Sequence, residues 1–173
     1  AGSCGETLVV AGGSNFPNGP PWEGGSKLFT KRAFALHSSD GVWKEIAPLP
    51  RPIANGVSVT TPRGVLCIGG EDHEQVFREV FMLEDAQGEI NIRSFPPLPQ
   101  PVTKACGVLL GDNIYLIGGA DAVDSAIASK RVWKLSLTTP TAWHEQPPLP
   151  GEGRIFAVAG AIGTDLYVFS GSK

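Results

Sequence analysis

The side chains of this chain that could carry out chemistry are charged residues that follow two short recurring motifs. Glu71 comes directly after a Gly-Gly pair, and Arg78 follows it closely in the chain. A carboxylate with a cation nearby can exchange a proton with a bound ligand, so Glu71 and Arg78 are the candidate acid–base pair. The alternative is that Glu71 is a solvated loop acid beside Asp72 and Glu74.

Three further cations follow the second motif, Pro-Leu-Pro. They are Arg51, Lys104 and Arg154, one after each copy of the motif. If they face one opening, they suit an anionic ligand, because an Arg guanidinium pairs with a carboxylate through two hydrogen bonds. The alternative is that each cation bonds only to loop carbonyls of the adjoining segment.

Both motifs recur with one period, which indicates a repeat protein. Gly-Gly closes the apolar runs 8–13, 65–70 and 114–119, and a degraded Ser-Gly copy closes 166–171. Pro-Leu-Pro recurs at 48–50, 97–99 and 148–150. A shared period of about 50 residues is typical of the kelch β-propeller, in which each repeat is one blade of four strands. The predicted fold class is therefore all-β, a kelch-type β-propeller.

The repeats divide the chain into about three and a half four-stranded blades of a single partial propeller, residues 1–173. We expect blades at 1–47, 53–96 and 102–147, and a half blade at 155–171. Propellers close with roughly four to eight blades. We therefore expect the remaining blades to come from further chain or from another chain.

Composition argues against several classes of partner. The net charge of −3 provides no basic field for nucleic acid and no polybasic surface for anionic lipid. No apolar run approaches the roughly 20 residues of a membrane helix, and no leader segment is recognisable. The cysteines Cys4, Cys67 and Cys106 fall at unrelated phases of the repeat. We expect them to be buried thiols, and not a disulfide framework or a metal site.

Other kinds of site find no support in the sequence. His37, His73 and His144 lie in three different contexts without the spacing of zinc or copper ligands. Neither a phosphate-binding loop nor a serine nucleophile motif occurs. We predict no metal and no cofactor.

The segment AGGSNFPNGPPWEGGSK, residues 11–27, is more specific than the repeat. It resembles the opening segment of the cyclically permuted mutarotase family, six-bladed kelch-type relatives of bacterial N-acetylneuraminate (sialic acid) epimerase. The resemblance implies acid–base interconversion of the anomers of an acidic sugar. It also implies a bacterial periplasmic or cell-surface protein.

The resemblance adds Asn15, Trp22 and Glu23 to the candidate sugar-binding residues, beside Arg51, Lys104 and Arg154. Trp22 could stack on a sugar ring or fasten the long loop to its blade, and Asn15 could be structural or contact the ligand. The family's Asn-Gly-Glu…Arg catalytic loop does not occur here, and on this alignment it would follow residue 173. The competing prediction is a kelch interaction module whose loops bind a protein or peptide.

Overall fold

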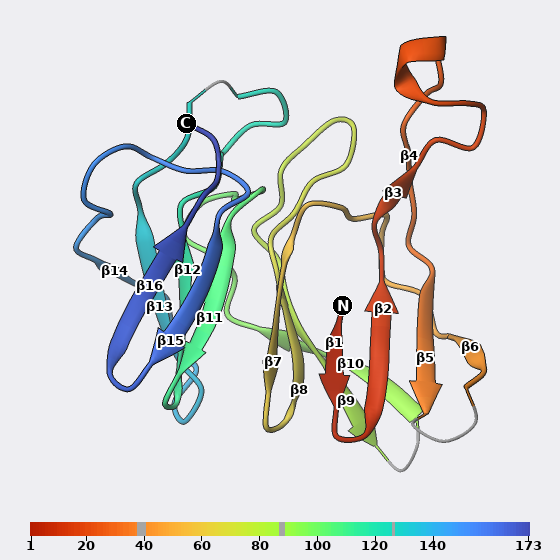
Figure 1. Cartoon of the computed structure of the whole chain (residues 1–173). Helices are drawn as coiled ribbons and strands as arrows, with labels where there is room; N and C mark the ends of the chain where they lie inside the picture. Colours follow the sequence, from red (N-terminus) through yellow and green to blue (C-terminus); the bar gives the residue numbers. More distant parts are fainter. Residues whose placement is uncertain (38–40, 87–88, 126) are drawn as a thin grey trace.

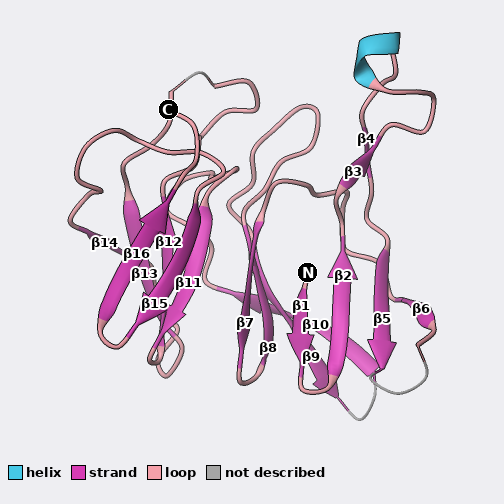
Figure 2. Ribbon diagram, in the orientation of Figure 1, coloured by secondary structure: helices cyan, strands magenta, loops and turns pink. Residues whose placement is uncertain are grey.

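The computed structural model describes residues 1–37, 41–86, 89–125 and 127–173. Its strands form three four-stranded antiparallel sheets and two two-stranded sheets, and the larger sheets follow one another in chain order (Figure 1). Among the described residues, Figure 2 shows helix only in one short 3₁₀ turn, η1 (Pro21–Glu23). The prediction of an all-β fold built from kelch-type blades is confirmed.

Each four-stranded sheet is a meander in which neighbouring strands are joined along the chain. The first contains β1 (Gly2–Cys4), β2 (Thr7–Ala11), β5 (Ala33–His37) and β6 (Trp43–Ile46). The second contains β7 (Val57–Thr61), β8 (Gly64–Ile68), β9 (Val80–Ala86) and β10 (Glu89–Phe95). The third contains β11 (Cys106–Leu110), β12 (Asn113–Ile117), β13 (Val132–Ser136) and β14 (His144–Gln146). The last pairs β15 (Val158–Ile162) with β16 (Asp165–Phe169), and β3 (Ser14–Asn15) pairs with β4 (Leu28–Phe29) in a loop of the first sheet.

The first strand of each sheet lies against the first strand of the next. β1 contacts β7, β7 contacts β11, and β11 contacts β15. The sheets therefore stand as blades around these four strands. The loops β2–β5, β8–β9 and β12–β13 gather at one end of the blades (Figure 1).

The Pro-Leu-Pro motif ties the entry of one blade to the body of the blade before it. The backbone N–H of Leu49, Leu98 and Leu149 donates to the carbonyl oxygen of Lys31, Arg78 and Lys130, respectively. The Leu98 side chain is fully buried in the core between the second and third sheets. Burial of one leucine side chain stabilises the fold by about 2 kcal/mol. The motif recurs because each blade needs this contact.

The Gly-Gly motif makes the contact between blades at the loop end. The N–H groups of Gly13, Gly70 and Gly119 donate to the carbonyl oxygens of Ile53, Val102 and Arg154 in the following blade. At Gly69 the backbone has φ +58°, and an added Cβ would lie 2.2 Å from the Val102 oxygen. Glycine is needed there both for its conformation and for the close approach of the next blade.

Candidate functional site

At the end of the blades where the loops gather, one residue of each blade junction has a left-handed backbone conformation. Asn55, Lys104 and Phe156 have φ values of 55°, 58° and 54°. The Lys104 N–H donates to the Asn55 oxygen, and the Phe156 N–H donates to the Lys104 oxygen, each at 2.8 Å. These bonds place one side chain from each of three successive junctions at a common rim.

Glu71 lies beside this rim with its side chain buried. The residue is 2% exposed, and its backbone N–H and oxygen both bond to Ala54. Asn55 Nδ2 donates to Glu71 Oε1 at 2.6 Å, and Lys104 Nζ lies 3.5 Å from Glu71 Oε2. Among the described residues, Oε2 has no hydrogen-bond partner. Lys104 compensates the charge of this buried oxygen, and an O–H or N–H group of a ligand can supply the hydrogen bond that it lacks.

A cavity of about 350 Å³, here named the mouth cavity, opens over Glu71. Lys27 and Phe29 come from the first blade, His73 from the β8–β9 loop, and Asp124 from the β12–β13 loop. Lys27 Nζ lies 4.6 Å from the centre of the Phe29 ring, and the Phe29 and His73 rings are 6.5 Å apart. The remaining lining residues are Asn55, Glu71, Lys104, Val123 and Phe156. The cavity thus combines a buried carboxylate, two ammonium groups and aromatic walls, which suits an acidic polar ligand.

The structure places Lys104, and not Arg78, beside Glu71. Arg78 Nε donates to the Leu98 oxygen at 2.8 Å. Its repeat-equivalent positions are Lys31 and Lys130, since the three share the Pro-Leu-Pro contact. A cation at this position is a feature of every blade, and among the described residues the ion-pair contact of Glu71 is with Lys104.

Arg51 and Arg154 do not join Lys104 at the mouth cavity. Arg51 lies 3.1 Å from Glu79 and over the Phe77 ring, and Arg154 donates to the Ser170 oxygen at 2.9 Å. Both the bond to Gly119 and the blade register put Arg154 where the other junctions have Ile53 and Val102. The three cations share a place near Pro-Leu-Pro in the sequence but not the same backbone position. The expected convergence of three cations is therefore replaced by Lys104 and Lys27.

The long loop of the first blade projects away from the blades (Figure 1). Asn15, Trp22 and Glu23 are exposed, and Trp22 is 83% exposed. None of the three lines the mouth cavity in the part of the chain that the structure describes. Lys27 and Phe29 at the base of the loop do so instead.

Sequence reasoning missed Asn55, Lys27, Phe29 and His73. A signal existed for Asn55, because an Asn before a Gly is well suited to a positive φ. The other three carried none, since their meeting depends on how loops of different blades pack.

Over residues 1–37, 41–86, 89–125 and 127–173, no group of three or more His, Cys, Asp or Glu side chains is arranged to hold a metal ion. In the same ranges, no helix has the length and apolar character needed to span a membrane.

Comparison with known proteins finds curated relatives of which the chain matches a part. No family model matches the chain. It is 35% identical over 92 residues to the N-acetylneuraminate epimerase of Brucella suis, which covers 49% of this chain and 24% of that protein. It is 27% identical over an alignment of 177 residues to acyl-CoA-binding domain-containing protein 5 of Arabidopsis thaliana, which covers 96% of this chain and 26% of that protein.

A solved structure of YjhT superposes on the chain with a TM-score of 0.68 at 17% identity, covering 83% of this chain and 46% of YjhT. The matched segments span about a quarter of the length of the curated relatives. The kelch-type blades therefore share the fold of YjhT, and about half of the chain is similar in sequence to an N-acetylneuraminate epimerase, in agreement with the resemblance predicted from the sequence.

Proposed function

We propose that this chain forms part of a mutarotase for an acidic sugar of the N-acetylneuraminate type. The observation that carries the proposal is the buried Glu71 carboxylate, which has one unbonded oxygen 3.5 Å from Lys104 Nζ in the mouth cavity. The similarity to N-acetylneuraminate epimerases supports the choice of sugar. We also propose a periplasmic or cell-surface location, and the bacterial origin of this relative agrees with it.

Mutarotation opens and recloses the hemiketal ring, so it needs a base and an acid but no net proton. Glu71 Oε2 takes the proton of the anomeric hydroxyl while the bond from the anomeric carbon to the ring oxygen breaks. The Lys104 ammonium gives a proton to the ring oxygen, and the open chain carries a keto group. Reclosure on the other face of that group returns both protons. Lys27, at the rim of the mouth cavity, holds the sugar carboxylate.

The test follows the anomer signals of freshly released α-N-acetylneuraminate by proton NMR, with the spontaneous rate in the same buffer as reference. We expect acceleration by the chain and its loss, by about 100-fold or more, in Glu71→Gln. The matched control is Glu74→Gln, because Glu74 is an exposed acid of the same loop that does not line the mouth cavity. Equal rates for the folded chain and for buffer would refute the proposal for this chain, as would full activity in Glu71→Gln.

We also propose that further blades cover the outer faces of the first and last sheets. Val158, Ile162, Tyr167 and Phe169 on β15–β16 are 63%, 69%, 41% and 57% exposed. Leu8, Val10 and Trp43 of the first sheet are also exposed. Apolar faces of this kind pack against neighbouring blades elsewhere in the chain. The blades can come from further chain or from another chain.

A protein-binding module is the second candidate function. The observation that favours it is the exposure of two large apolar side chains on the loop end, Trp22 at 83% and Ile127 at 80%. Sugar binding separates the two candidates: saturation-transfer NMR with N-acetylneuraminate gives a signal that Lys104→Met weakens if the chain is a mutarotase. A folded chain that gives no such signal favours the module.

A further inference from the structure

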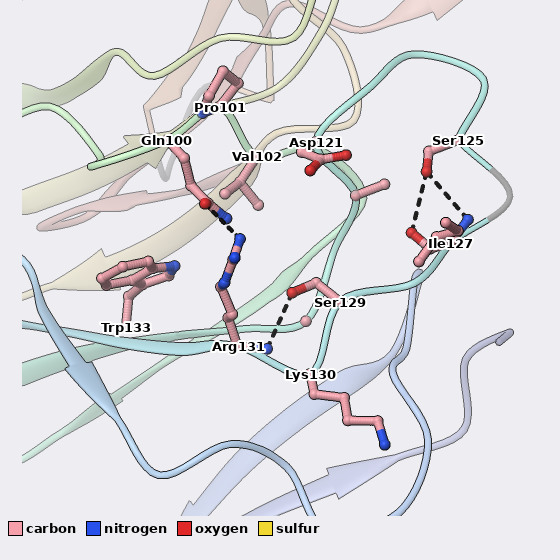
Figure 3. Close-up of a pocket in the computed structure, with 12 residues that line it drawn as sticks. Gln100, Pro101, Val102, Asp121, Ser125, Ile127, Ser129, Lys130, Arg131 and Trp133 are labelled. Carbon is pink, nitrogen blue, oxygen red and sulfur yellow. Dashed lines mark hydrogen bonds between the residues drawn. The ribbon is translucent and has the colours of Figure 1, made fainter.

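A second hollow, here named the side groove, lies on the third blade beside the β12–β13 loop, which also contributes Val123 and Asp124 to the mouth cavity. It has a volume of about 340 Å³ and runs between the Gln100–Val102 junction and the β12–β13 loop (Figure 3). The side groove and the mouth cavity have no lining residue in common among those described. A ligand of the side groove would therefore occupy a separate site.

The side groove depends on a β12–β13 loop that is longer than its counterpart in the second blade. The loop spans 118–131 in the third blade, against 69–79 between β8 and β9 in the second. Asp121 and Ser129 of this loop line the groove opposite Gln100 (Figure 3).

Trp133 brings a buried, unbonded donor to this groove. Phe34 and Phe81 hold the equivalent position in the first and second blades. Each of the three aromatic residues lies two positions after the residue whose carbonyl oxygen accepts from the first glycine of the Gly-Gly motif, which is Arg32, Glu79 or Arg131. Trp133 is 9% exposed, and its Nε1 has no hydrogen-bond partner among the described residues. Trp143, by contrast, donates from Nε1 to the Pro96 oxygen at 3.0 Å. A phenyl ring fills this place elsewhere, so the indole adds a donor that the packing does not require.

Arg131 brings a charge that is poorly neutralised within the blade. The equivalent Arg32 donates twice to Glu45, at 2.8 and 3.1 Å, and this hydrogen bonding holds the pKa of Glu45 below its usual value. Arg131 Nε instead stays 3.9 Å from Glu145, and its Nη1 donates to the neutral Gln100 Oε1 at 2.5 Å. Figure 3 shows the Arg131 side chain on the wall of the groove, between Trp133 and Ser129.

We propose that the side groove binds the carboxylate of a small acidic molecule, held by the Arg131 guanidinium and the Trp133 Nε1–H. A guanidinium with a second N–H donor beside it matches the two oxygens of a carboxylate. Asp121, across the groove, accepts from a hydroxyl or amide N–H of the same ligand. The carboxylate can belong to a sugar acid or to the C-terminus of a peptide, which share this chemistry. The site does not depend on mutarotase activity at Glu71.

The experiment is a titration of the ¹⁵N-labelled chain, followed by NMR at the indole N–H signal of Trp133, which Trp133→Phe identifies by its loss. The probes are N-acetylneuraminate, its methyl ester and the dipeptide N-acetyl-alanyl-alanine. We expect a saturable downfield shift with one or both acids and none with the ester. Which acid acts identifies the source of the carboxylate.

Matched variants separate the side groove from the other cationic sites. Arg131→Gln is expected to weaken binding by about tenfold or more, because a charge-assisted hydrogen bond is lost. Arg32→Gln, the same change in the first blade, and Lys104→Met, at the mouth cavity, leave the titration unchanged. The proposal fails if neither acid shifts the signal or if the ester acts as the acids do. It also fails if Arg32→Gln weakens binding as much as Arg131→Gln, or if Lys104→Met abolishes the shift.

Discussion

Glu71 is a charge that the blade architecture does not demand. The position after the Gly-Gly or Ser-Gly pair is held by Ser14, Glu71, Ala120 and Ser172 in the four blades. Glu71, Ala120 and Ser172 each form a backbone bridge to the junction at the start of the same blade, and a serine or alanine suffices for it, as at Ala120 with Thr103. The blade architecture therefore does not require a buried carboxylate at this position, and we propose that Glu71 serves the mouth cavity.

The pairing of Glu71 with Lys104 has a consequence for stability. Lys104→Met leaves the Glu71 carboxylate buried without its cation, and the free energy of unfolding is expected to fall by about 3 kcal/mol. Adding Glu71→Gln removes the buried charge and restores at least half of that loss. Urea denaturation of the two variants measures both effects.

Lys27→Met is the control for this pair, since Lys27 is exposed and lies over a ring rather than beside a buried acid. It should change the free energy of unfolding by less than about 1 kcal/mol. Equal losses in Lys104→Met and Lys27→Met would show that the Glu71–Lys104 contact contributes nothing.

The recurring motifs predicted the blades because each motif makes one backbone contact that every blade needs. Pro-Leu-Pro and Gly-Gly are visible in the sequence for that reason. The side chains at the junctions follow no such rule. Arg51, Lys104 and Arg154 look equivalent beside Pro-Leu-Pro, but the segment before Arg154 is longer, so Arg154 takes the backbone position of Val102.

The close contact of Gly69 with the following blade predicts a large loss of stability when this residue is replaced. Gly69→Ala forces a Cβ to within 2.2 Å of the Val102 oxygen at φ +58°, so the second and third blades must separate locally. The expected loss is about 3 kcal/mol or more, from backbone strain and the displaced contact together. Thermal or urea unfolding measures it.

Gly111→Ala provides the comparison, because Gly111 has φ +55° but an added Cβ meets nothing within 4 Å. That variant bears only the conformational cost of about 1–2 kcal/mol. If Gly69→Ala is no less stable than Gly111→Ala, the close approach of the blades is not what requires glycine.

The burial of the three cysteines determines how the stability of the whole molecule depends on pH above pH 9. Cys4 and Cys106 are buried, Cys67 is partly buried, and none forms a disulfide in the structure. Burial is the leading cause of the raised thiol pKa in all three, and it raises the pKa of Cys67 to about 11. The sequence anticipated thiols of this kind from their irregular phase in the repeat, although it could not tell which blades cover them.

Ionisation of a buried thiol lowers the free energy of unfolding, because the thiolate is less favourable in the folded protein than in the unfolded chain. The unfolded chain loses the Cys67 proton near pH 9 and the folded chain near pH 11, so stability falls as the pH rises through this window. We expect the urea midpoint to decline from pH 9 to pH 11 and Cys67→Ala to flatten the decline. An identical decline in Cys67→Ala would exclude the thiol as its source.

Asn55, Lys104 and Phe156 share one backbone conformation at the rim but carry side chains of different chemistry. An amide, an ammonium and a phenyl group stand on nearly the same φ, between 54° and 58°, because hydrogen bonds between neighbouring junctions hold the backbone. The backbone conformation at these three positions thus does not depend on which side chain is present. Substitution at one of these positions can change which ligand the mouth cavity binds without changing the backbone at the other two. A propeller of this kind can acquire a new ligand preference by single replacements along one ring of backbone positions.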